Sequence, residues 1–142
     1  MRLAVTVLHN VARGSFAGYD PATADLRHGH TFQVTADSVD EAGKLLWTLG
    51  NVDGPDDLPE HLSSYGNQVW AYRQRMNRSV SVGDVVMVYS HDDSRMIAVL
   101  VCEPVGWRKI AWVPEYEHGS NDDVTSKSYD AYCQTWASTH RN

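Results

Sequence analysis

The chain has 142 residues, 42% of them hydrophobic and 21% charged, and its formal net charge is −6. This length fits one domain that can bury a core of its own, and the acidic balance argues against a protein that wraps a nucleic acid around much of its surface. Two cysteines are too few for a disulfide framework, and no apolar run reaches the roughly 18 residues of a membrane span or forms a signal peptide, so we expect a cytoplasmic protein without membrane contact.

Two strands separated by a long loop are predicted near the N-terminus. Residues 3–8 are β-branched and alternate in polarity, and residues 31–36 place Phe32 and Val34 on one face. The stretch between them, residues 10–29, is rich in Gly, Ala and Asp, which predicts a loop. Loops of this length are often functional.

A helix is predicted after the second strand. Ser38 and Glu41 form a capping box, in which each side chain can bond the backbone N–H of the other residue. We expect Gly50 to end the helix in a left-handed conformation. One apolar stripe follows from the spacing i, i+3, i+4, i+7 of four residues: Ala42, Leu45, Leu46 and Leu49.

The middle of the chain predicts an acidic loop, a second helix and a β-hairpin. Residues 51–64 are acidic and contain prolines, with a helical turn expected after Pro59. Residues 67–76 fit a helix with Val69, Tyr72 and Met76 on one side, although a strand is also compatible with this segment. Three strands are then expected, with covered central strands at 85–89 and 96–102, a polar turn at 91–94 between them, and a last strand from 105 to 113.

The last segment has its own amphipathic pattern. Aromatic and apolar residues again recur at i, i+3, i+4, i+7, as Tyr129, Tyr132, Cys133 and Trp136. This predicts a C-terminal helix that docks an aromatic stripe. The fold class predicted is therefore α+β, a single core domain over residues 1–113 with a mostly antiparallel sheet of about five strands and two or three helices, followed by an extension at 114–142.

The most distinctive motif is YRQRMNRSVSVGDVV at residues 72–86. Together with TVLHNV at 6–11 and VGW at 105–107, it resembles a family of uncharacterised small proteins of actinobacteria and their phages and plasmids. The motif is also similar to the YodL-like domains of mobile elements. The resemblance implies a shared fold and a mobile-element setting, without a chemical activity. Met76 stands where the family pattern has a helix-ending glycine, and the chain after Pro114 lies outside the resemblance.

The same motif suggests an anion-binding surface. Arg73, Arg75 and Arg78 are forked donors suited to phosphate or carboxylate, and the neighbouring Trp70 and Tyr72 can stack on bases. An alternative is that the arginines pair with the acidic loop at 53–60. Gly83-Asp84 predicts a turn in which Asp84 accepts local backbone N–H bonds, and small RNA-binding domains of the PUA and ASCH type use a similar unit.

Trp47 is the most informative single side chain. It lies five positions after Ala42, nearly opposite the apolar stripe of its helix. A tryptophan on a polar face is either covered by another part of the chain or available to a partner. The C-terminal aromatic helix is one candidate cover, and a protein–protein contact, including self-association, is the alternative.

A metal site is conceivable at His28-Gly29-His30. Residues two apart on a strand face the same way, so both imidazoles could reach one zinc ion, with His9 as a third ligand. The segment is similar to the HGH strand of 6-pyruvoyl-tetrahydropterin-type synthases, but that family's catalytic cysteine has no counterpart here. No nucleophile, phosphate-binding or dinucleotide motif is found.

These observations favour a non-catalytic binding or regulatory protein of phage or mobile-element origin. We expect it to act on a host protein through a surface that contains Arg73, Arg75, Arg78 and the aromatic residues near them, with Trp47. The alternatives are a nucleic-acid-binding β-domain and a zinc-dependent enzyme using His9, His28 and His30.

Overall fold

A single five-stranded sheet forms the centre of the computed structural model, which describes residues 1–92 and 94–112. Its strands are β1 (Arg2–Asn10), β2 (Leu26–Thr35), β3 (Val85–Ser90), β4 (Met96–Cys102) and β5 (Trp107–Trp112). They lie in the order β2-β1-β3-β4-β5, and every pair of neighbours is antiparallel. The predicted α+β class and the antiparallel sheet are thereby confirmed.

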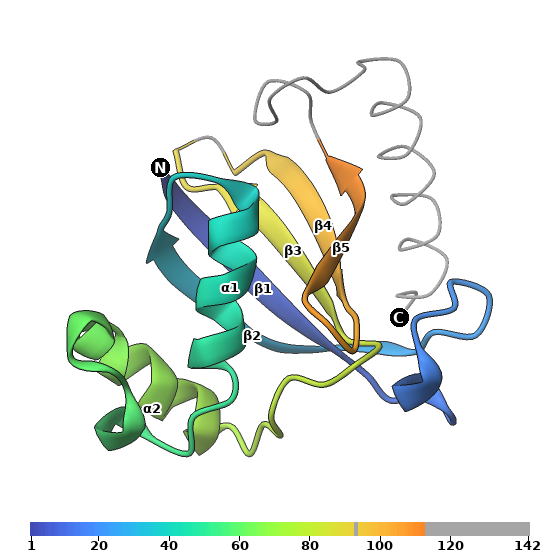
Figure 1. Cartoon of the computed structure of the whole chain (residues 1–142), viewed down its shortest axis with the longest axis horizontal. Helices are drawn as coiled ribbons and strands as arrows, with labels where there is room; N and C mark the ends of the chain where they lie inside the picture. The colour runs from blue at the N-terminus through green and yellow to red at the C-terminus, as the bar shows by residue number, and fades with distance from the viewer. Residues whose placement is uncertain (93, 113–142) are drawn as a thin grey trace.

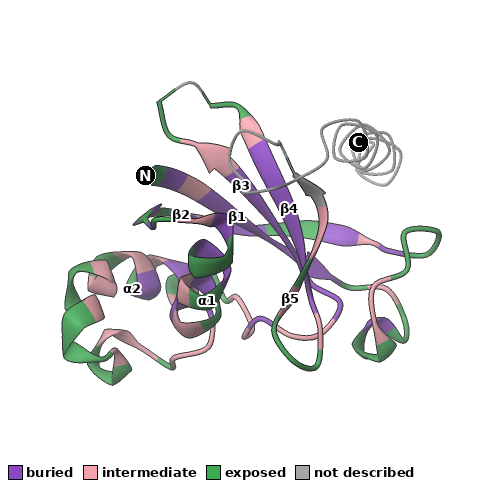
Figure 2. Ribbon diagram, turned by 45° about the horizontal axis from the view of Figure 1, so that its top comes forward, coloured by how far each residue is buried: buried purple, intermediate pink, exposed green. Residues whose placement is uncertain are grey.

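Two helices lie on one face of this sheet (Figure 1). They are α1 (Val39–Leu49) and α2 (Gly66–Gln74), and three short 3₁₀ turns accompany them: η1 (Ser15–Ala17), η2 (Pro55–Asp57) and η3 (Glu60–Tyr65). Figure 2 shows that the strands are largely buried, whereas the outer surfaces of η2, η3 and α2 are exposed. The acidic segment therefore forms a projecting, solvent-facing part of the helical layer.

The segment containing η3 and α2 also covers the edge of β2. Gln68 donates through its side-chain amide to the Gln33 carbonyl at 2.8 Å and accepts from the Gln33 N–H at 2.6 Å. The Tyr65 hydroxyl accepts from the Thr35 N–H at 3.1 Å. Since unpaired strand edges promote association with other chains, these side chains protect the sheet at one of its two ends.

Apolar side chains are buried on both faces of the sheet. The larger cluster lies between sheet and helices and includes Val5, Phe32, Leu46 and Tyr72. The other face buries a second cluster, which consists of Leu8, Ala24, Leu26, Val85, Met87, Val99 and Val101. This double burial explains why β3 and β4 are apolar almost without interruption, as predicted for central strands.

The start of α1 agrees with the capping prediction, and its end does not. Ser38 accepts a bond from the Glu41 N–H at 3.1 Å, while the Glu41 carboxylate binds the Asp37 N–H instead of that of Ser38. Gly50 has φ −87°, so the expected left-handed conformation is wrong. Close packing accounts for the glycine, because a Cβ there would lie 2.5 Å from Cγ2 of Val80.

The second helix ends before Met76. Its last residue is Gln74, and Met76 has a left-handed backbone with φ 62° and is 90% exposed. The prediction that Met76 shares the buried side of the helix with Val69 and Tyr72 is therefore wrong. The chain turns at this residue, so Met76 leaves the helical face.

Two further predictions concern the start of β2 and the C-terminal segment. β2 begins at Leu26, so residues 26–29 belong to a strand and not to the predicted loop. The predicted C-terminal helix lies outside the described residues. In the part of the chain that is described, no helix is both long and apolar enough to cross a membrane.

Candidate functional site

A buried carboxylate organises the end of the sheet where β1, β2 and β3 meet the segment after α2. Asp84 is fully buried, and it accepts bonds from the backbone N–H groups of Asn10 (2.8 Å) and Ser81 (2.9 Å). Both terminal nitrogens of Arg78 donate to it, at 2.8 and 2.7 Å. Nδ1 of His9 lies 3.2 Å from Oδ2. We call these residues, with Tyr72, the Asp84 network.

The electrostatics of the Asp84 network keep its carboxylate ionised. Burial by itself raises the pKa of Asp84, but hydrogen bonds from His9, Arg78 and the two backbone N–H groups outweigh it, and the net pKa is lowered from 3.8. The hydrogen bond with Asp84 raises the pKa of Arg78, against the opposing effect of burial. Asp84 and Arg78 therefore form a lasting ion pair with most of their bonding capacity satisfied.

Tyr72 connects α2 to the Asp84 network. Its hydroxyl donates to the Arg78 carbonyl and lies 3.1 Å from Nε2 of His9. Burial raises the pKa of Tyr72 to about 12, and the hydroxyl therefore stays neutral at physiological pH.

Arg73 and Asn77 bind backbone carbonyls around the same motif. Arg73 donates twice to the Val52 carbonyl, at 3.0 and 2.8 Å, and also to the Asn77 carbonyl and the Ser79 hydroxyl. The Asn77 amide donates to the carbonyls of Gly29 and Tyr72. These bonds fix the irregular segment after α2 against β2 and against the chain that follows α1.

The three arginines are thus placed differently from each other. Arg73 and Arg78 point inward and bind carbonyls or Asp84, and neither forms an ion pair with a carboxylate of the 53–60 loop. The alternative pairing with that loop is therefore wrong. Arg75 is exposed and makes no hydrogen bond or ion pair with the residues the structure describes. The sequence did not reveal this division, because it depends on where the chain turns at Met76.

The histidines of the proposed zinc site do not converge. A β-bulge at Gly29 pairs His28 with Leu8 and His30 with Val7, so the two imidazoles belong to opposite faces of the sheet. The expectation that they face the same way is therefore wrong. His9 is bound within the Asp84 network, and no group of three His, Cys, Asp or Glu side chains suited to a metal occurs in the described ranges.

Close packing requires the glycine at this bulge, which the sequence does not show. A Cβ at Gly29 would lie 2.8 Å from Cδ2 of His9, so only glycine allows the His9 ring to approach this strand. His30 is buried beside Phe32 and Tyr72, and its Nδ1 has no hydrogen-bond partner among the described residues. Burial lowers the pKa of His30, with smaller contributions from Arg75 and His28.

The exposed aromatic residues lie beside two separate hollows. Trp47 is 46% exposed and borders a hollow of about 220 Å³ between α1 and the β4–β5 turn, which we call the Trp47 hollow. Its other lining residues are Glu103, Pro104, Gly106 and Trp107. Trp70 is 57% exposed and borders the Trp70 hollow, of about 630 Å³, with Pro55, Ser63, Ser64, Gly66 and Asn67. Tyr72, the third aromatic candidate, is buried.

Comparison with known proteins gives no relative: no family model, no curated protein and no solved structure matches the chain. The functional argument therefore depends on the geometry of these surfaces.

Proposed function

We propose that the protein is a non-catalytic, cytoplasmic binding module that recognises a partner protein through the Trp47 hollow. The observation that carries this proposal is the exposed Trp47 ring on a well-packed amphipathic helix. Large aromatic side chains next to a hollow are the commonest centres of protein interfaces. The family resemblance adds a host protein as the target of a phage or mobile-element product.

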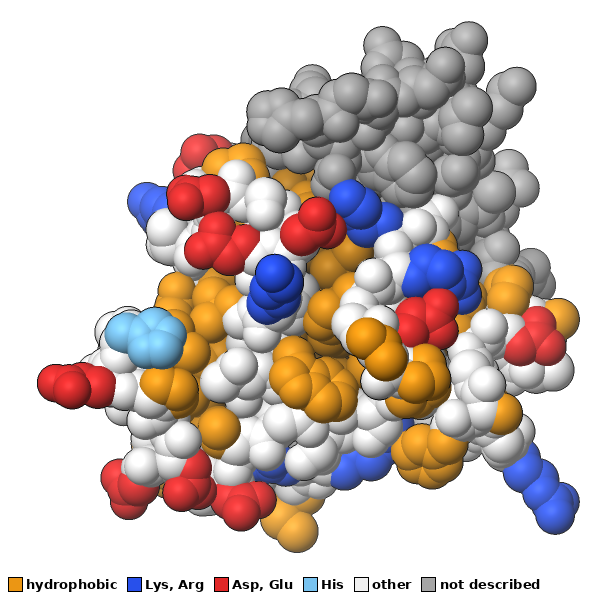
Figure 3. All heavy atoms as spheres, in the orientation of Figure 1, with side chains coloured by type: hydrophobic (Ala, Val, Ile, Leu, Met, Phe, Trp, Pro, Cys, Tyr) orange, Lys and Arg blue, Asp and Glu red, His pale blue; other side chains and the backbone are white. Residues whose placement is uncertain are grey.

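The surroundings of Trp47 support an apolar contact. The adjacent β4–β5 turn exposes Pro104 and Val105, and Val105 is 93% exposed. Trp107 packs against α1, where a Cβ on Gly43 would lie 3.0 Å from its Cδ1. Figure 3 shows hydrophobic side chains gathered on this face of the molecule, with charged groups of both signs between them. An apolar segment of a partner fits such a surface, because a partner with one strong charge would gain little there.

The alternative functions receive less support from the geometry. A nucleic-acid surface built on the central motif loses Arg73 and Arg78 to internal bonds, which leaves Arg75 as its exposed cation. The zinc-enzyme hypothesis needs His28 and His30 on one face, contrary to the bulge at Gly29. The acid–base residues of the Asp84 network bind one another, as expected for a structural role.

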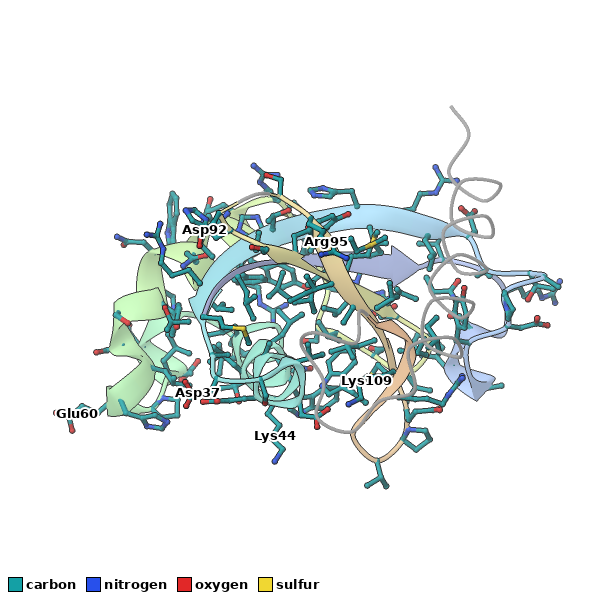
Figure 4. All side chains as sticks on the ribbon, turned by 90° about the horizontal axis from the view of Figure 1, so that it is seen from above. Asp37, Lys44, Glu60, Asp92, Arg95 and Lys109 are labelled. Carbon is teal, nitrogen blue, oxygen red and sulfur yellow. The ribbon has the colours of Figure 1, made fainter. Side chains whose placement is uncertain are left out.

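Affinity capture from a lysate of an actinobacterial host tests the proposal, with Trp47→Ala and a matched control. Lys44→Ala is the control because Lys44 lies on the same helix and points away from the molecule (Figure 4). We expect the wild type and Lys44→Ala to retain one partner that Trp47→Ala loses. Removal of a central tryptophan costs about 2 kcal/mol or more, which raises Kd at least about 25-fold.

The competing functions are tested on the same preparations. Single- and double-stranded DNA and RNA are titrated at two salt concentrations, and the zinc content is measured. Salt-dependent nucleic-acid binding that Trp47→Ala leaves intact, stoichiometric zinc, or an unchanged partner of Trp47→Ala would each contradict the proposed function.

A further inference from the structure

The Trp70 hollow differs from the Trp47 hollow in its electrostatic surroundings. Residues 51–66 contain four carboxylates and no lysine or arginine, and all four side chains are exposed, as Asp53, Asp56, Asp57 and Glu60. None of them forms an ion pair with another described residue. Figure 3 shows acidic side chains along this edge, and in Figure 4 Glu60 points away from the sheet.

The nearest positive charge is already engaged. Arg73 lies at the base of this region and is held by the Val52 carbonyl, the Asn77 carbonyl and the Ser79 hydroxyl. Its donors are therefore directed away from the four carboxylates, and the region keeps a net negative charge. Such a charge attracts cationic groups and repels phosphate.

An aromatic ring completes the chemistry of a cation-binding surface. Trp70 is more than half exposed, and it lines the same hollow as Pro55, which begins the acidic turn η2. A tryptophan face attracts Lys and Arg side chains through its π-electrons, and it also packs against their methylene groups. Ser63 and Ser64 line the same hollow and supply hydroxyl groups.

The geometry points to the Trp70 hollow as a second binding surface, which takes an extended Lys- or Arg-containing segment of a partner protein. A basic side chain lies on the Trp70 ring, and neighbouring basic side chains pair with Asp56, Asp57 and Glu60. Charge complementarity selects this occupant over a nucleic acid. The inference is independent of the Trp47 hollow, because the two surfaces are lined by different residues.

Selection from a random dodecapeptide display library tests the inference on the full chain. We expect the peptides retained by the wild type to be enriched in Lys and Arg and to compete poorly at high salt. A synthetic copy of the most enriched peptide is then titrated against the wild type, Trp70→Ala and the triple variant D56N/D57N/E60Q. Each variant is expected to raise Kd about tenfold or more, because each removes a stated part of the surface.

Matched controls separate this surface from general attraction to an acidic protein. Trp47→Ala and Asp20→Asn, which alters an exposed carboxylate on the loop before β2, are expected to leave Kd within about twofold of the wild type. All substituted side chains are exposed, so circular dichroism is expected to show folded variants. Enriched peptides without basic residues, equal loss in Asp20→Asn, or unchanged binding in Trp70→Ala would overturn the inference. A dimer in sedimentation that Trp70→Ala dissociates would also overturn it, by making a second copy the occupant.

Discussion

At the residue scale, Asp84 links the stability of the fold to pH. Its pKa is lowered in the folded protein, because the bonds from His9, Arg78 and the backbone outweigh the effect of burial. The ionised form is therefore stabilised by folding. The sign follows: this contribution is complete above the unfolded-state pKa near 3.9, and it is lost as the pH falls through the lower folded-state value.

Replacement of Asp84 by Asn removes this contribution and leaves Arg78 partly unpaired. We expect a loss of about 3–5 kcal/mol in the free energy of unfolding at pH 7, measured by urea titration.

A milder variant, Tyr72→Phe, removes the hydroxyl that contacts Arg78 and His9, at an expected cost of about 1–3 kcal/mol. Unchanged stability in Tyr72→Phe together with lost partner binding would instead place the Asp84 network in the functional surface.

At the element scale, the backbone just after α2 is strained at one residue, and a glycine there is expected to relieve the strain. Met76 has φ 62° and is 90% exposed, so its side chain gains little from packing in this left-handed position. We expect Met76→Gly to raise the free energy of unfolding by about 0.5–1 kcal/mol. Met76→Ala is the matched control, because alanine keeps a Cβ and therefore the strain. A stabilisation of equal size in both variants, in thermal or urea unfolding, would show that the side chain and not the backbone is responsible.

Elements fixed by local pattern were predictable, and those fixed by distant contacts were not. The capping residue Ser38 and the apolar stripe of α1 act within a few residues, and the β3–β4 hairpin follows from two apolar runs. The bulge in β2 lies at Gly29, where a side chain would collide with the ring of His9 from the neighbouring strand. Likewise, Asp84 was predicted to bind local N–H groups, as it does at Ser81, but its bonds to His9 and Asn10 span more than seventy residues.

At the scale of the whole molecule, the candidate site divides in the same way. The position of Trp47 opposite the apolar stripe followed from the spacing along one helix, but its exposure was only one of two alternatives until the structure showed it. The inward direction of Arg73 and Arg78 depends on carbonyls and a carboxylate from other elements. The motif therefore does not form the continuous arginine-and-tryptophan surface that the sequence suggested. Its charged side chains mainly bind groups of β1, β2, β3 and α2 to one another.

The reaction rate of the Cys102 thiol tests whether the Asp84 network makes the sheet unfold as one cooperative unit. Cys102 is 1% exposed on β4, and burial raises its pKa to about 11, so the native thiol is shielded and largely protonated. In a Cys133→Ser background, only this thiol reacts with a disulfide reagent such as DTNB. We expect labelling at pH 8 to be at least about 1,000-fold slower than in urea-unfolded protein, because it requires global opening with a free energy of several kcal/mol. Tyr72→Phe should accelerate it by the factor that its loss of stability predicts. Fast labelling of the native protein, or a rate indifferent to Tyr72→Phe, would show that β4 opens locally without the Asp84 network.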